Sequence, residues 1–252
     1  MTTETGKTAV LFVTCLGDTF YPAAAAAVWR VLQLLGIAVT CPAKQTCCGQ
    51  PMFNAGYFRE ARRLAQHFLD VFAATSGPIV APSASCAAMV REHYPKLFAN
   101  DPQRLALARS IGARTFEFCE FLTREQSVDL AQYGARFDDS VTFHWSCHFR
   151  SLGVKTEPVD LIRQIAGIRY LALPDMNECC GFGGAFALHY PDVSRAMVAD
   201  KLHAIRSTGA HWLIYADAGC ALNITGYANR VGQPLRAMHI AELIDRSLGE
   251  GS

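Results

Sequence analysis

The apolar positions of the chain fall into short runs that are followed by cysteines. Thr8–Cys15 (TAVLFVTC) and Ser140–Cys147 (SVTFHWSC) each predict a buried strand that ends on a cysteine. Pro78–Cys86 (PIVAPSASC) and Trp212–Cys220 (WLIYADAGC) predict two further strands, each with a cysteine a few residues past its end. Cysteines therefore follow the predicted strands at four places.

Longer amphipathic stretches lie between these runs. Apolar residues recur at helical spacing from Phe58 to Phe72, with charged residues on the opposite face. A counterpart follows the turn Tyr190–Asp192, and its apolar positions are Val193, Ala196, Met197, Ala204 and Ile205. An earlier helix is predicted from about Pro22 to Leu35, with Gly36 as its stop signal. This alternation of strands and helices is typical of an α/β fold with mainly parallel strands.

The cysteines reveal an internal repeat. Cys15 is followed after 31 residues by the pair Cys47–Cys48 and a glycine, and Cys147 is followed after 31 residues by Cys179–Cys180 and a glycine. All three cysteines are shifted by 132 positions. A repeat of this length indicates duplication of a structural unit.

The segments that close each copy also correspond. Cys86 follows the first pair after 37 residues, and Cys220 follows the second pair after 39. We therefore predict two homologous halves, residues 1–134 and 135–252, with a polar linker at Gly134–Ser140. The expected fold has two pseudo-symmetric lobes, each a small, mainly parallel sheet flanked by helices, with metal sites at the strand ends.

The composition allows a folded core and excludes several classes of protein. Of 252 residues, 51% are hydrophobic and 18% are charged, which argues against disorder. The net charge of +1 provides no field of one sign for binding nucleic acid. The apolar stretch Ala23–Val39 is interrupted by Arg30, Gln33 and Gly36, and it is shorter than the roughly 18 residues that a transmembrane segment needs.

The N-terminus weakly resembles a signal peptide, with Lys7 before the apolar run Thr8–Leu16. That run recurs inside the chain, however, which a cleaved segment has no reason to do. Ten cysteines in a chain large enough to form a core, without an export signal, indicate metal or redox chemistry in a reducing compartment. We therefore expect a cytoplasmic protein.

Each predicted half can bring four thiols together, because ligands collect at the carboxyl ends of the strands in open α/β sheets. These candidate metal ligands are Cys15, Cys47, Cys48 and Cys86 in the first half, and Cys147, Cys179, Cys180 and Cys220 in the second. The glycine after each cysteine pair allows the backbone to approach closely.

Four explanations for these cysteines remain open. Four thiolates can hold an iron–sulfur cluster, and adjacent cysteines favour this because they can bind different irons of one cluster. A structural zinc site usually has two to four residues between its paired cysteines, and neither pair here has that spacing. Dithiol exchange normally uses C-x-x-C, which is absent from the sequence. Buried thiols packed as small hydrophobic groups would explain neither the glycines nor the duplication.

On these motifs the chain resembles the CCG (cysteine-rich) domain proteins, which carry a cysteine, a Cys-Cys-Gly and a closing cysteine, usually twice. Relatives include one of the subunits of heterodisulfide reductase and the iron–sulfur subunit of glycolate oxidase. The segments Leu11–Asp18 (LFVTCLGD), Cys47–Pro51 (CCGQP), Cys179–Gly184 (CCGFGG) and Met238–Glu242 (MHIAE) are most similar to the stand-alone lactate utilisation members of this family.

The resemblance implies an oxidoreductase role as the iron–sulfur electron-transfer subunit of a complex that oxidises L-lactate to pyruvate. The implied partners are a ferredoxin-like iron–sulfur subunit and a third small subunit. The alternatives are a scaffold stabilised by zinc or a cluster, and a thiol or disulfide reductase of the heterodisulfide reductase type. No substrate site is evident in the sequence.

The heterodisulfide reductase relatives close each motif with C-x-x-C, whereas this chain has Ser83 and Asp217 at the first of those two positions. Four cysteines per half suit a [4Fe–4S] cluster, with one or two clusters per chain and zinc in one lobe as the alternative. Ser83, Asp217, His144 and His148 are candidates for contacts just outside the metal ligands, and Asp217 is alternatively a ligand or a helix cap.

Several other residues lie near the motifs in the sequence. His189 is grouped with the two histidines of the second half, and Arg150 is a weak candidate for binding an anionic substrate. Trp145 and Phe182 are expected to shield sulfur atoms from water. The two remaining cysteines are predicted to be structural: Cys119 corresponds to Ala241 of the second copy, and Cys41 has no clear counterpart.

Overall fold

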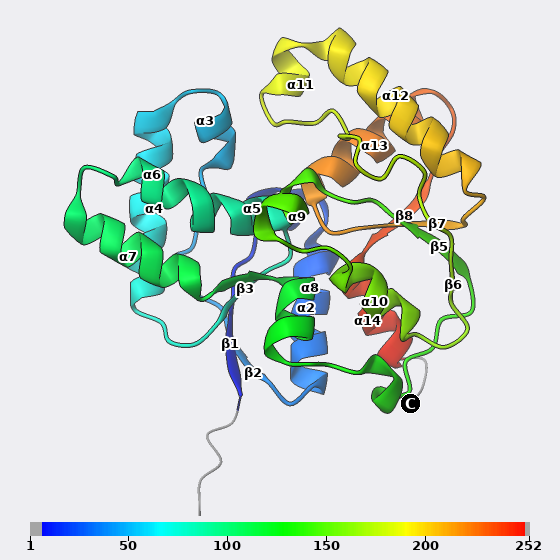
Figure 1. Cartoon of the computed structure of the whole chain (residues 1–252), viewed down its shortest axis with the longest axis horizontal. Helices are drawn as coiled ribbons and strands as arrows, with labels where there is room; N and C mark the ends of the chain where they lie inside the picture. The colour runs from blue at the N-terminus through cyan, green and yellow to red at the C-terminus, as the bar shows by residue number, and fades with distance from the viewer. Residues whose placement is uncertain (1–6, 250–252) are drawn as a thin grey trace, which may run out of the picture.

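A computed structural model describes residues 7–249, and it contains two four-stranded sheets in which every strand pair is parallel (Figure 1). The first sheet has the order β2-β1-β3-β4 and the second has the equivalent order β6-β5-β7-β8. The strands are β1 (Thr8–Leu11), β2 (Ala38–Thr40), β3 (Ile79–Ala81), β4 (Thr115–Glu117), β5 (Ser140–Phe143), β6 (Arg169–Tyr170), β7 (Trp212–Tyr215) and β8 (Arg236–His239). The predicted α/β fold with two pseudo-symmetric lobes is confirmed.

Helices connect and flank the strands of both sheets. In the first lobe they are α1 (Cys15–Phe20), α2 (Pro22–Leu34), α3 (Gln50–Asn54), α4 (Phe58–Ala73), α5 (Ala84–Ala88), the π-helix η1 (Met89–His93), α6 (Tyr94–Leu97), α7 (Pro102–Ala113), α8 (Phe118–Glu120), the π-helix η2 (Phe121–Glu125) and the 3₁₀-helix η3 (Leu130–Tyr133). In the second they are α9 (Cys147–Leu152), α10 (Glu157–Arg163), α11 (Phe186–His189), α12 (Pro191–Ser207), α13 (Ala218–Arg230) and α14 (Ile240–Gly249).

The four cysteines that follow a strand in the sequence begin or lie within a helix rather than ending the strand. β1 stops at Leu11 and β5 stops at Phe143, so each strand ends four residues before the cysteine that had been predicted to close it. Cys15 and Cys147 are instead the first residues of α1 and α9. These cysteines still lie beyond the carboxyl ends of their strands, where a parallel sheet collects its ligands.

The amphipathic helices are confirmed, but the buried face of α12 differs from the prediction. Val193 is 52% exposed and Ala196 is also exposed, although both had been assigned to the apolar face. The buried positions are Ser194, Val198, Lys201, Leu202, Ala204 and Ile205. The face is rotated because Ser194 packs on the second cysteine loop, where its Oγ donates a 2.8 Å hydrogen bond to the Gly181 carbonyl.

The two lobes pack through reciprocal pairs of helices. α14 of the second lobe packs on α2 of the first, and α8 of the first lobe packs on α10 of the second. In the same way α5 contacts α9 and α1 contacts α13. Figure 1 shows α5 and α9 side by side between the lobes. Each contact between the lobes is therefore matched by a contact between the equivalent elements, as in a dimer with twofold symmetry.

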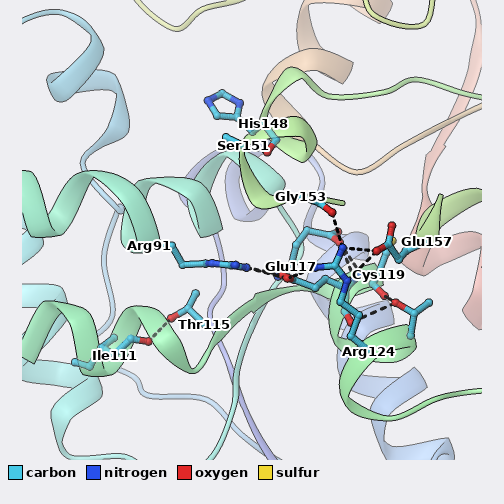
Figure 2. Close-up of polar contacts among 12 residues, drawn as sticks. Arg91, Ile111, Thr115, Glu117, Cys119, Arg124, His148, Ser151, Gly153 and Glu157 are labelled. Atoms are coloured by element: carbon cyan, nitrogen blue, oxygen red, sulfur yellow. Dashed lines mark hydrogen bonds and ion pairs between the residues drawn. The ribbon is translucent and has the colours of Figure 1, made fainter. Parts of the chain in front are cut away.

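An ion-pair network fixes one side of this interface (Figure 2). The buried Glu120 carboxylate is paired with Arg91 at 2.7 Å and with Arg124 at 3.1 Å. The Arg124 guanidinium also pairs with Glu157 and donates a 2.6 Å hydrogen bond to the Gly153 carbonyl, both in the second lobe. Arg124 therefore links the end of the first lobe to α10.

The apolar core is continuous across the two lobes. One cluster includes Val31 and Leu32 of α2 together with Leu243, Ile244 and Leu248 of α14. A smaller cluster packs behind the second cysteine loop. The division at residues 134 and 135 stays a prediction, because the core itself does not separate there. Among residues 7–249, no helix is long and apolar enough to cross a membrane.

Candidate metal centre

The four predicted cysteines of the first lobe lie together. The sulfur of Cys15, at the start of α1, is 3.3 Å from that of Cys47, and the sulfur of Cys48 is 3.4 Å from that of Cys86 in α5. The Gly49 amide points at the Cys47 sulfur, at 3.4 Å. Gly49 has a φ of +84°, which favours glycine, and it lets the loop turn from the cysteine pair into α3.

The second lobe repeats this arrangement. The sulfurs of Cys180 and Cys220 are 3.0 Å apart, and the Gly181 amide lies 3.4 Å from the Cys179 sulfur. Cys147, the first residue of α9, forms a side-chain hydrogen bond with Cys179. Each lobe therefore brings four thiols from three separate segments to one place.

Both cysteine groups face the same cavity between the lobes. It has a volume of about 100 Å³, and seven of the eight predicted cysteines line it, Cys47 being the exception. Gln50 and Phe182, from the two cysteine loops, are also part of its wall. The two predicted sites are therefore neighbours across one cavity rather than separate sites on opposite faces of the molecule.

Contact between the sulfurs shifts the pKa values of neighbouring thiols in opposite directions. Hydrogen bonds from Cys15 and Cys48 lower the pKa of Cys47 to about 3, and bonds from Cys147 and Cys180 lower the pKa of Cys179 to about 2. The pKa of Cys15 is raised by its bond to Cys47 and by burial, and the pKa of Cys147 is raised in the same way by Cys179. Each lobe thus has a thiolate ready to bind a metal, and binding releases protons from the neighbouring thiols.

Ser83 and Asp217 meet at the boundary of the lobes. The Ser83 hydroxyl donates a 2.6 Å hydrogen bond to Oδ1 of Asp217, and the Ser85 amide donates to the same oxygen at 3.2 Å. Asp217 occupies the N-cap position of α13, but its side chain makes no capping bond. The other carboxylate oxygen is buried with no hydrogen-bond partner among the described residues. The residues that replace a cysteine in each half therefore join the halves to one another.

His148 forms a bridge to the first lobe. Its Nε2 lies 3.1 Å from the amide nitrogen of Gln50, which also donates to the Ser85 carbonyl at 3.0 Å. Because an amide nitrogen can only donate, Nε2 accepts and Nδ1 carries the proton. That nitrogen lies 3.6 Å from the Cys147 sulfur. His148 therefore contacts the cysteine group, and its role just outside the ligands stays a prediction.

His144 lies closest to the second cysteine group. It is 1% exposed, and its potential ligand nitrogen lies within 4.8 Å of the sulfurs of Cys180 and Cys220. Within residues 7–249 neither ring nitrogen has a hydrogen-bond partner. Together with the bond from Cys180, His144 lowers the pKa of Cys220 to about 6. A buried imidazole without partners, next to two thiols, suits a metal site.

The donor set fits an iron–sulfur cluster in each lobe. Such clusters are held by four cysteine thiolates, and each lobe provides four sulfurs in contact. Adjacent cysteines can bind different irons of one cluster. The residues that would hold the group are the eight predicted cysteines, while His144, His148, Ser83 and Asp217 surround them.

Other candidates lie outside the cavity. His189 is exposed at the end of α11, and Trp145 packs against Phe143 and Phe149. Arg150 is exposed and lies with Trp145 at a separate depression. Phe182 does line the cavity, and the expectation that it shields sulfur atoms from water stays a prediction.

The two remaining cysteines lie away from the candidate centre. Cys119 is fully buried in the core, like its counterpart Ala241, and Cys41 is exposed beside Gln45. Neither of these cysteines lines the cavity. They are not part of the candidate centre.

Sequence reasoning missed Lys201, Gln50 and Ser85. Lys201 is fully buried in α12, and its Nζ donates a 3.1 Å hydrogen bond to the Asp175 carbonyl, near the second cysteine loop. Aligning the halves at the shift of 132 positions pairs Lys201 with the buried Leu69. A lysine at an apolar position was the signal that could have identified it. Gln50 and Ser85 carried no such signal.

The CCG family, described as a cysteine-rich domain, matches residues 9–91 and 141–225, and so covers both cysteine groups. The chain belongs to this family. The chain is 41% identical over 240 residues to lactate utilization protein A of an Exiguobacterium species, covering 94% of this chain and 97% of that protein. It is 42% identical over 236 residues to lactate utilization protein A of Geobacillus kaustophilus, covering 93% of this chain and 97% of the relative.

One solved structure is similar along nearly the whole length of this CCG chain. It is the crystal structure of a hypothetical protein from Helicobacter pylori, with a TM-score of 0.69 and 10% sequence identity. The match covers 98% of this chain and 50% of the other, so this chain spans about half the length of that protein. At this identity the similarity supports the fold alone.

Proposed function

We propose that this CCG protein is the iron–sulfur electron-transfer subunit of a multi-subunit complex that oxidises L-lactate to pyruvate. The relatives named lactate utilization protein A, about 40% identical over most of the chain, support the link to lactate. The paired cysteine groups support the electron-transfer role. This assignment makes the chain part of an oxidoreductase that acts in the cytoplasm.

The observation that carries the proposal is the shared cavity, lined by seven cysteines from both lobes. Oxidation of lactate to pyruvate releases two electrons and two protons, whereas a [4Fe–4S] cluster accepts one electron at a time. Two such groups close together would hold both electrons of one turnover. The thiolates of each lobe would hold the cluster, and the buried wall of the cavity would limit access of water.

The other parts of the reaction are assigned to partner subunits. Arg150, the candidate for binding a carboxylate, is exposed and lies outside the cysteine cavity. We therefore place lactate binding elsewhere in the complex. The partners we propose are a ferredoxin-like iron–sulfur subunit and a third small subunit.

Metal analysis after anaerobic purification tests the proposal. We expect a brown protein with roughly four iron and four sulfide per occupied site, and an EPR signal after reduction. Cys86→Ser and Cys220→Ser should each lower the iron content. Cys41→Ser is the matched control, because this exposed cysteine lies outside the cavity. A colourless protein that holds only zinc would overturn the assignment.

A second candidate function is a zinc-stabilised scaffold for partner subunits. His144, Cys180 and Cys220 favour it, because their ligand atoms lie within 4.8 Å of one another and zinc binds both nitrogen and sulfur. This candidate predicts stoichiometric zinc, no EPR signal after reduction, and a complex that stays active after Cys220→Ser. Electron transfer predicts the opposite result in each measurement.

A further inference from the structure

We propose that the two metal sites are unequal, and that His144 and Lys201 make the second-lobe site the one that accepts an electron more readily. This inference depends on the proposed function, because it concerns the reduction potentials of iron–sulfur clusters. His144 and Lys201 act here as positioning residues, since they place polar groups near the cysteine sulfurs.

The duplicated sequence provides an internal comparison for His144. At the shift of 132 positions its counterpart in the first lobe is Phe12. Phe12 is fully buried and packs edge-on against Phe68 and Phe72, with ring centroids 4.8 and 5.7 Å apart. The same position is therefore part of an apolar core in one lobe and a buried imidazole beside two cysteines in the other.

Lys201 shows the same contrast. Its counterpart Leu69 is fully buried in α4 and carries no charge. The Lys201 ammonium is held under the second cysteine loop by the Asp175 carbonyl, and it interacts electrostatically with Cys180 and Cys179. Burial lowers the pKa of Lys201 from its usual value, and a buried ammonium is screened less by salt than an exposed one.

The reduced form of a cluster is one unit more negative than the oxidised form. Hydrogen bonds to cluster sulfurs and nearby positive charge stabilise that form, and so raise the reduction potential. Among the described residues that line the cavity, the one basic side chain is His148 of the second lobe, while His144 and Lys201 lie behind the second group of cysteines rather than in the cavity wall. The residues of the chain therefore favour the added electron in the second lobe.

The neighbouring negative groups do not cancel this difference. The Asp217 carboxylate acts electrostatically on Cys147 and Cys220 of the second lobe, and two donors of the first lobe, the Ser83 hydroxyl and the Ser85 amide, offset part of its charge. Asp175 and Glu178, which lie near Lys201, are exposed to solvent, and water and salt screen their charge. On this proposal the buried Lys201 ammonium outweighs these negative groups at the second site.

A redox titration of the anaerobically purified full chain, followed by EPR, tests the inference. Cys86→Ser and Cys220→Ser assign each signal to a lobe. The next variants, His144→Phe and Lys201→Leu, introduce the side chains of the first lobe. Lys201→Met replaces Lys201→Leu if the latter does not fold. Lys96→Met, which removes an exposed charge of the first lobe, is the control.

We expect two midpoint potentials, of which Cys220→Ser removes the higher. His144→Phe and Lys201→Leu should each shift the higher potential downward and leave the lower one in place, whereas Lys96→Met should move neither. A single common potential, a higher potential assigned to the first lobe, or unchanged potentials in both variants would overturn the inference while leaving the proposed function intact. A protein without iron and sulfide would instead remove the proposed function, and this inference with it.

Discussion

At the scale of single residues, the most informative position is the contact between Ser83 and Asp217. These two residues are equivalent in the repeat, yet one is a hydroxyl donor and the other an acceptor. Two identical residues could not form this bond as well, so the duplication has become asymmetric where the lobes meet. Asp217 gives up the N-cap bond of α13 and instead receives donors from the other lobe.

The bond between the lobes can be tested by replacing Asp217. Asp217→Ala leaves the buried Ser83 hydroxyl and the Ser85 amide without their acceptor, which should lower the free energy of unfolding by about 1–3 kcal/mol. Asp217→Asn keeps an acceptor oxygen and should cost less. Urea denaturation of both variants measures the difference. Equal stability of the alanine variant and the wild type would contradict this interpretation.

Glu117 predicts a dependence of stability on pH. Burial raises the pKa of this carboxyl to about 8, against an ordinary value of 4.5, so the folded state holds a proton that the unfolded state releases above about pH 4.5. Its contribution to stability is therefore fully present below pH 4.5 and falls as the pH rises to 8, by at most about 1.4 kcal/mol per pH unit.

Glu117→Gln removes this titrating group but keeps the acceptor oxygen that bonds the Cys119 amide at 2.7 Å in the wild type. The difference in the free energy of unfolding between variant and wild type should grow in favour of the variant from pH 5 to pH 8. Chemical denaturation at several pH values measures it. A constant difference across that range would show that Glu117 is ionised in the folded protein.

At the scale of elements, each sheet ends in the same capped helix, built from different residues. Before α8, Glu117 accepts from the amides of Cys119 and Glu120, and the Glu120 carboxylate accepts from the Glu117 amide. Before α14, Nδ1 of His239 accepts from the Ala241 amide, and Glu242 accepts from the His239 amide. The geometry of the cap is kept although a carboxyl is exchanged for an imidazole, which burial keeps neutral by lowering the pKa of His239 to about 4.

The second cysteine loop depends on close contact with α12. Gly181 has a φ of +79°, and a Cβ there would lie 2.8 Å from the Ser194 carbonyl oxygen. Gly181→Ala should therefore displace the loop from the helix and lower the metal content of the second site. Gly209→Ala is the control, because Gly209 has a φ of +69° but open space around a Cβ, so only the backbone strain of roughly 1–2 kcal/mol remains.

Metal analysis and denaturation of both glycine variants separate the two effects. The expected result is loss of metal in Gly181→Ala alone, with Gly209→Ala retaining it. If both variants keep their metal, close packing of the loop on α12 is not needed to hold the second site.

The π-helix η2 connects the lobes through Arg124. Arg124→Ala removes its bonds to Glu120, Glu157 and the Gly153 carbonyl, and leaves the buried Glu120 paired with one cation, Arg91, among the described residues. We expect a loss of about 1–3 kcal/mol in the free energy of unfolding, measured by denaturation. Arg59→Ala breaks an exposed ion pair with Glu60 and should lower the free energy of unfolding by less than Arg124→Ala does. Similar losses in both variants would show that Arg124 stabilises the fold no more than an exposed ion pair does.

At the scale of the whole molecule, the sequence predicted the features that follow from the duplication. The shift of 132 positions identified the two lobes and six of the cysteines, because duplication preserves spacing, and Cys86 and Cys220 completed the eight at a shift of 134. It could not predict the shared cavity or the helix pairs that pack between the lobes, since both depend on how the two copies pack. The burial of Lys201 beside the second cysteine loop was missed for the same reason, because it comes from tertiary contacts rather than from a local pattern.

The packing of helices between the lobes predicts that neither half is stable and soluble without the other. In the first half, α2 buries Val28, Val31 and Leu32, and α14 of the second half packs on this helix. Residues 1–134 expressed alone would expose this apolar face, so we expect aggregation or poor solubility. The two fragments 1–134 and 135–252, expressed together, should instead co-elute in size-exclusion chromatography.

The metal content of these fragments adds a second readout. The cavity is built from both lobes, with cysteines of each in its wall, so co-expressed fragments should hold iron and sulfide at the level of the intact chain. A single fragment should hold less, because the wall provided by the other lobe is missing and water reaches the cysteines. If fragment 1–134 alone is monomeric and soluble and holds its full content of iron and sulfide, each lobe folds independently. The helix packing between the lobes would then be a contact between two domains that are each stable alone.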